Sequence, residues 1–138
     1  MSYIKMIHII IGIIFTFTGC LEYPIYKEKT GISEQNISCL KIITLEDSDL
    51  IIARKYLKAS ENCKYELVLT PHIIHDCQNP QVKSLGSDID GYVSLKLYSG
   101  NRSIFRSQTD FKGEDHSSHL ERLLEDFILL DEVKEIKR

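Results

Sequence analysis

"YVSLKLYSGNRSIFRSQTDF", residues 92–111, is the stretch that decides the fold of this chain. In its first part, 92–98, apolar and polar side chains alternate, which is the pattern of a strand with one buried face. The residues "SGNR" then supply a tight turn, and 103–111 returns with a second alternating pattern. We therefore predict a β-hairpin. The residues that share one face of each strand are Val93, Leu95 and Leu97 on the first, and Phe105, Ser107, Thr109 and Phe111 on the second.

Two further strands and two helices are predicted around the hairpin. Residues 64–74 also alternate, with Pro71 interrupting the far end, and 37–45 is short and rich in β-branched residues, so both predict strands. Residues 46–62 and 116–133 carry apolar side chains at helical spacing. The order β-α-β-β-β-α predicts an α+β fold, a small mixed sheet with two helices packed on one face.

The amino terminus carries an apolar run from Met6 to Thr18, preceded by a single positive side chain, Lys5. The run is shorter than the roughly 20 residues that cross a bilayer and longer than the usual 4–8 residues of a buried strand. A charged start, an apolar stretch and small residues before a cleavage point are typical of a secretory signal peptide. The alternative is an uncleaved N-terminal anchor.

The residues "FTGC", 17–20, resemble the lipobox of bacterial lipoproteins, with Phe17 where that family usually has leucine. The resemblance implies that residues 1–19 are removed as a signal peptide and that Cys20 becomes the first residue. It also implies that Cys20 carries a thioether-linked diacylglycerol and usually an amide-linked acyl chain such as palmitate. Two or more chains anchor a protein stably in a membrane. Leu21, in place of the aspartate that favours inner-membrane retention, implies the outer membrane, facing the periplasm.

Composition describes a mildly acidic globular domain on a tether. Removing residues 1–19 takes away one lysine and no acid, so the formal charge changes from −3 to −4. A chain of this charge without a basic stripe does not suggest nucleic-acid binding. Residues 20–36 contain Pro24, Gly31 and mixed charges, and we expect the lipidated cysteine and a linker there. That leaves 37–138 as a single α/β domain.

Three cysteines, Cys39, Cys63 and Cys77, remain in a compartment where disulfides persist. If 64–74 is one continuous strand, its rise places Cys63 and Cys77 roughly 40 Å apart, whereas a disulfide needs Cα atoms within about 7 Å. In a parallel β-α-β arrangement the first two strands start side by side, which favours a Cys39–Cys63 bridge. Antiparallel strands would favour Cys39–Cys77 instead.

The histidines raise the alternative of a metal-binding protein. His72, His75 and Cys77 are close in sequence, and His116 and His119 lie three apart at a predicted helix start. Imidazole and thiolate are zinc ligands, so a zinc-binding periplasmic lipoprotein that uses His72, His75 and Cys77 is the alternative function. The spacing matches no standard zinc finger, and solvated histidines explain the pattern more simply. We expect no metal and no other cofactor.

No sequence motif of hydrolases, metalloproteases or nucleotide-binding enzymes occurs, so we expect no enzyme. We expect a non-enzymatic envelope lipoprotein that binds a protein or an envelope component in an assembly or accessory role. Its candidate surfaces are an exposed sheet edge and the hairpin, with Tyr98, Arg102 and Arg106. The predicted layout is similar to that of the small α/β domains of periplasmic assembly lipoproteins, a likeness that does not transfer function.

Overall fold

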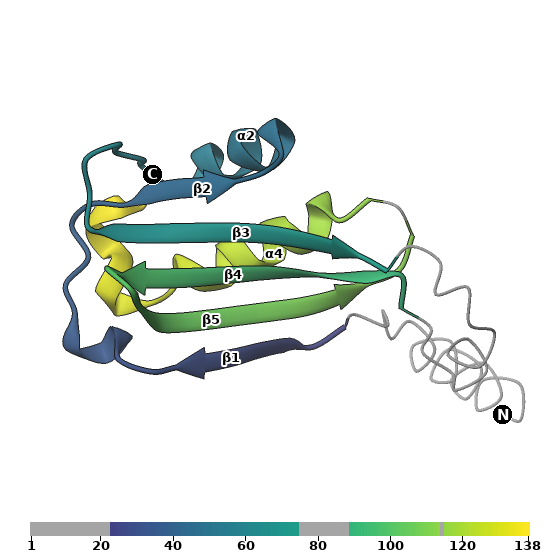
Figure 1. Cartoon of the computed structure of the whole chain (residues 1–138), viewed down its shortest axis with the longest axis horizontal. Coiled ribbons are helices and arrows are strands. Elements are labelled where there is room, and N and C mark those ends of the chain that lie inside the picture. Colours follow the sequence, from purple (N-terminus) through teal and green to yellow (C-terminus); the bar gives the residue numbers. More distant parts are fainter. Residues whose placement is uncertain (1–22, 75–88, 114) are drawn as a thin grey trace, which may run out of the picture.

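The computed structural model describes residues 23–74, 89–113 and 115–138. Within these ranges five strands form one mixed sheet in the order β1-β5-β4-β3-β2 (Figure 1). The strands are β1 (Ile25–Lys29), β2 (Lys41–Thr44), β3 (Tyr65–Ile73), β4 (Gly91–Ser99) and β5 (Arg102–Phe111). The helices are α2 (Asp47–Tyr56) and α4 (Ser117–Phe127), with the short 3-10 helices η1 (Ile32–Glu34) and η2 (Asp131–Ile136). The predicted α+β class is confirmed.

The predicted hairpin is the centre of the sheet. β4 and β5 pair antiparallel, and Ser99 faces Arg102 across a turn of two residues, Gly100 and Asn101. Gly100 has a φ of 59°, the left-handed conformation that two-residue hairpin turns require at their first central position. Glycine adopts it without a steric cost. The residues "SGNR" therefore form the tight turn that their composition predicts.

β2 and β3 are parallel, with α2 as the crossover between them. Their register places Lys41 opposite Glu66, so the two strands start side by side. Cys39 and Cys63 precede these starts and form a disulfide with a Cα–Cα distance of 5.8 Å. The prediction of a Cys39–Cys63 bridge is confirmed. The two cysteines meet because the parallel strands β2 and β3 start side by side.

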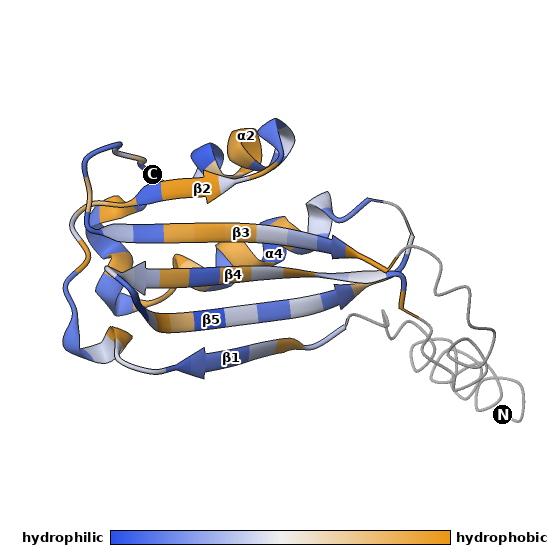
Figure 2. Cartoon of the chain, viewed as in Figure 1, coloured by the Kyte–Doolittle hydropathy of each residue, from blue (hydrophilic) through white to orange (hydrophobic). Residues whose placement is uncertain are grey.

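The expectation of a linker in residues 20–36 is corrected at β1 and η1. β1 adds an edge strand to the sheet, with Ile25 opposite Thr109 of β5. The buried Oγ1 of Thr109 donates to the carbonyl oxygen of Pro24 over 3.1 Å, and Lys27 Nζ lies 2.7 Å from Asp126 Oδ1 on α4. β1 is mostly hydrophilic (Figure 2). An edge strand with four exposed residues has no apolar alternation for a sequence pattern to detect.

The core lies between the sheet and the helices. α4 runs behind the sheet in Figure 1, so the face toward the viewer is the one opposite α4. The α4 side chains at helical spacing are buried, and the rings of Phe127 and Phe105 of β5 lie 5.6 Å apart between centroids. Val133 and Ile136 of η2 extend this apolar layer. No helix in the described ranges is long and apolar enough to cross a membrane.

Candidate functional site

A row of charged side chains crosses the open face of the sheet, by which we mean the face opposite α4. Strand pairing places Lys96 of β4 opposite Arg106 of β5, and Arg106 opposite Glu28 of β1. Side chains alternate between the two faces of a strand, so the core residues Leu95 and Leu97 leave Lys96 between them pointing outward. The hairpin pattern that builds the core thus also builds this row.

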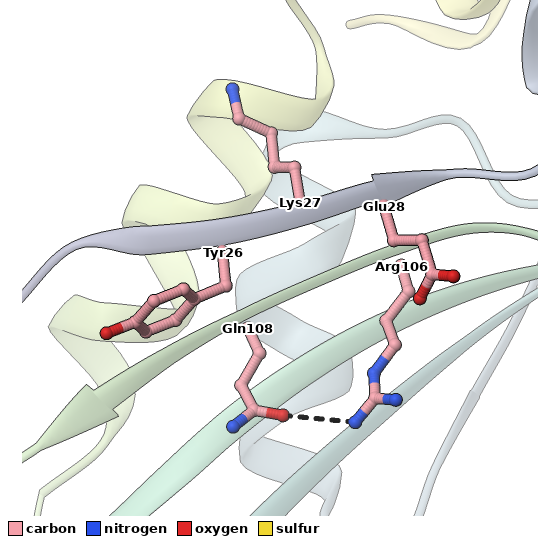
Figure 3. Close-up of a pocket in the computed structure, with 5 residues that line it drawn as sticks. All are labelled: Tyr26, Lys27, Glu28, Arg106 and Gln108. Carbon is pink, nitrogen blue, oxygen red and sulfur yellow. Dashed lines mark hydrogen bonds between the residues drawn. The ribbon is translucent and has the colours of Figure 1, made fainter.

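Two shallow depressions share this row. One has a volume of about 340 Å³ and the other about 200 Å³, and Glu28 and Arg106 belong to both. Figure 3 shows Tyr26, Glu28, Arg106 and Gln108 extending to the same side of the sheet, whereas Lys27 points toward the helix. The larger depression is lined by Glu28, Thr30, Lys96, Tyr98, Ser103 and Arg106. The smaller is lined by Tyr26, Lys27, Glu28, Arg106 and Gln108.

The two cations of the row are not neutralised by direct contacts within the described part of the chain. Arg106 donates from Nη2 to Gln108 Oε1 over 3.3 Å, a neutral acceptor, and neither Arg106 nor Lys96 forms an ion pair with a described residue. Like charges directly opposite on adjacent strands destabilise a sheet. The Lys96–Arg106 pair therefore disfavours the folded sheet. Glu28, opposite Arg106 on its other side, offsets part of this cost, and an anionic ligand would offset more.

The structure brings together two of the three predicted partner-binding residues. Tyr98 and Arg106 line the larger depression with Lys96. Arg102 does not line either depression, and its Nη2 donates to the carbonyl oxygen of Thr30 over 3.0 Å. This bond ties the start of β5 to the turn after β1, which indicates a structural role for Arg102.

The predicted zinc ligands are only partly described. His72 lies on β3, where its ring stacks on Tyr92 of β4 with centroids 4.8 Å apart. His75, Cys77 and the expected lipidation site Cys20 lie outside the described residues. His119, paired in sequence with His116, packs its ring 5.9 Å from that of Phe111. No described metal cluster includes His72 or His119.

A second polar site, which the sequence analysis did not find, joins the two helices. Asp49 in the first turn of α2 is fully buried, and its Oδ1 lies 2.8 Å from Nε2 of His116, the residue just before α4. Glu46 Oε2 lies 4.0 Å from the same nitrogen, with its side chain 46% exposed. Burying a carboxylate costs several kcal/mol unless it is paired and hydrogen-bonded.

One signal in the sequence pointed to Asp49. It precedes Ile52 and Ala53 by three and four residues, so it lies on the apolar stripe of the helix and not on its solvated face. An acid on such a stripe must find a partner inside the protein. Which partner it finds depends on the packing of α2 against α4, since His116 is 67 residues away.

Comparisons with known protein families, with curated proteins and with solved structures found no match to this chain.

Proposed function

We propose that this chain is a lipoprotein of the bacterial cell envelope, anchored in the outer membrane by lipid on Cys20 and facing the periplasm. It binds a partner and does not catalyse a reaction. The partner, a protein or another envelope component, presents anionic groups to the open face of the sheet. The proposal rests on one observation above all: Lys96 and Arg106 lie opposite each other beside Tyr98, and no described ion pair neutralises them.

The chemistry of this face suits a binding surface. Two cations attract carboxylates or phosphates, and arginine binds either group through two parallel hydrogen bonds. Tyr98 and Tyr26 add aromatic area with few rotatable bonds, and tyrosine is enriched at protein interfaces. Glu28 opposite Arg106 adds a negative group that orients a partner of mixed charge. The depressions are shallow, so an extended or flat partner fits them better than a small molecule does.

The position of β1 limits where the partner sits. Ile25, the first residue of β1, is five residues from Cys20, so the connecting chain reaches at most about 18 Å. With Cys20 lipidated, the sheet stays close to the membrane surface. The expected partner is therefore a membrane-associated component and not one far out in the periplasm.

Site-specific photo-crosslinking in cells tests the binding surface. A photoreactive phenylalanine analogue at Tyr98 is expected to give a discrete crosslinked product, whereas the same analogue at Lys58 is not. Lys58 is exposed, and it follows α2 near the carboxyl end of the chain, away from the depressions. Charge reversal by Lys96→Glu with Arg106→Glu is expected to abolish the Tyr98 product, with Lys58→Glu as the matched control. Equal crosslinking at both positions, or a product that survives the charge reversal, would contradict the proposal.

A further inference from the structure

The three residues Glu46, Asp49 and His116, which we call the acid–histidine cluster, lie where α2 begins and just before α4 begins. One ligand atom from each residue lies within 4.8 Å of the other two. Nε2 of His116 is 2.8 Å from Oδ1 of Asp49 and 4.0 Å from Oε2 of Glu46. Two carboxylates and one imidazole thus converge on one point from two separate helices.

A second observation indicates that the cluster is incomplete as a set of protein groups. Oδ2 of Asp49 is buried and has no hydrogen-bond partner among the residues that the structure describes. Its carboxylate is fully buried, and His116 is 6% exposed. A buried carboxylate with a single neighbour keeps unsatisfied lone pairs at low dielectric, where they are costly. A cation in the cluster would accept the free lone pairs of Oδ2 and would balance the buried negative charge of Asp49.

We propose that the acid–histidine cluster binds a divalent transition-metal ion, with Zn²⁺ as the best match to its donors. Zinc is bound by imidazole nitrogen and carboxylate oxygen at about 2.0–2.2 Å, so two ligands of one tetrahedral ion lie roughly 3.3 Å apart. The distances of 2.8 and 4.0 Å from His116 bracket this value, and the two carboxylate ligand atoms lie within 4.8 Å of each other, so side-chain shifts on the order of an ångström complete the geometry. Two carboxylates neutralise the charge of the ion.

The surroundings fit an ion that enters from solvent and is then bound by buried side chains. Glu46 is the half-exposed ligand at the entrance, and Asp49 and His116 form the base. The ring of Phe111 lies 6.1 Å from that of His116 and provides an apolar wall behind it. Three protein ligands leave at least one coordination position for water or an external donor. Calcium and magnesium are disfavoured, because both prefer shells made of oxygen.

Metal binding uses the lone pair of Nε2 of His116, so it takes the form of the imidazole in which that nitrogen carries no hydrogen. The hydrogen bond between Asp49 and His116 is then replaced by two metal–ligand bonds. Metal binding therefore links the start of α2 to the residue that precedes α4. The site is separate from the open face of the sheet and does not depend on the proposed partner-binding function.

Calorimetric titration of the full chain in detergent with ZnCl₂, after removal of metal by a chelator, tests the proposal. The background carries His72→Ala, His75→Ala and Cys77→Ser, which removes the three zinc ligands that the sequence predicted. One Zn²⁺ per chain is expected.

Ligand variants in the same background identify the site. Glu46→Gln changes an exposed side chain and is not expected to disturb folding, yet it should weaken Zn²⁺ binding at least about tenfold. Asp47→Asn is the matched control, an exposed acid one residue away and outside the cluster, and it should bind like the background. His116→Gln should abolish binding. Absence of stoichiometric Zn²⁺, or unchanged affinity in Glu46→Gln, would overturn the proposal.

Discussion

Oδ1 of Asp49 and Nε2 of His116 lie 2.8 Å apart although 67 residues separate them in the chain. Asp49 belongs to the crossover helix of the parallel β2–β3 pair, and His116 precedes the helix that covers the hairpin. Their contact joins the two halves of the fold across the interior side of the sheet. A buried carboxylate whose main described partner is one imidazole makes the stability of the domain depend on that imidazole.

Replacement of His116 by alanine is expected to destabilise the domain by about 3 kcal/mol, because it leaves the buried carboxylate of Asp49 without its partner. Urea unfolding with a chelator present measures this without a contribution from metal. His72→Ala is the control, since His72 is exposed on β3, and it should change stability by less than about 0.5 kcal/mol. Equal effects of the two variants would contradict the interpretation of Asp49–His116 as a linkage between the helices.

Loss of the Cys39–Cys63 disulfide is expected to cost roughly 3 kcal/mol, because the bond closes a loop with a sequence separation of 24 and restricts the unfolded chain. The variant Cys39→Ala with Cys63→Ala, compared with the oxidised protein by urea unfolding, measures the cost. Cys77→Ser is the control and should retain the bridge, seen as a Cys39–Cys63 peptide in a non-reducing digest. In a non-reducing digest of the unsubstituted protein, a disulfide between Cys77 and either Cys39 or Cys63 would contradict the structure.

Gly91→Ala is expected to destabilise the domain by about 2–3 kcal/mol or more through overpacking. A Cβ at Gly91 would overlap the carbonyl oxygen of His72, which belongs to the backbone of the paired strand, and would lie 2.6 Å from Cζ of Phe111. Gly100→Asn is the comparison. Its added Cβ would meet no atom within 4 Å, and asparagine tolerates the left-handed conformation, so the cost should stay below about 1 kcal/mol. Thermal unfolding of both variants decides; a smaller effect at Gly91 would show that β3 and β4 separate easily there.

The pKa of Asp115 is expected to lie below the ordinary aspartate range, because hydrogen bonds from Ser117 stabilise its charged form at the start of α4. Since the folded pKa is lowered, this contribution to stability is present above the unfolded pKa and is lost as the pH falls through the folded pKa. Carboxyl ¹³C NMR titration measures it. Ser117→Ala removes the side-chain hydrogen bond and keeps the backbone one, so the pKa of Asp115 should rise only part of the way. No rise in that variant would show that the Ser117 side chain contributes nothing.

Lipidation is tested by the intact mass of the full chain and of its Cys20→Ser variant after membrane fractionation. A mature species that starts at Cys20 with an added acyl mass, absent in the variant, is the expected result. A full-length unmodified mass in both would mean an uncleaved anchor, and the placement of the open face near an outer membrane would then have no basis.

The elements that a local pattern can define were predicted closely. The hairpin at 92–111 was recognised from alternation and a glycine turn. The carboxyl-terminal helix was recognised from its leucine spacing, although α4 ends at Phe127 and not at 133. The Cys39–Cys63 bridge followed from the parallel β-α-β arrangement. β1 was missed, because four of its five residues are exposed and its pairing with β5 depends on backbone hydrogen bonds and on Thr109. Such a strand has no signal within its own residues.

Local sequence determined which segments form strands or helices, and so which side chains share a face. It placed Lys96 on the outer face of its strand, between Leu95 and Leu97. It placed Asp49 on the inner face of its helix, beside Ile52 and Ala53. It did so because alternation and helical spacing act over a few residues. Only the tertiary structure decided what each face meets, namely Arg106 and Glu28 across two strand pairs, and His116 across two helices. Strand register and helix packing arise from the burial of the whole core. Each candidate site is therefore made of residues from separate segments that only the folded protein brings together.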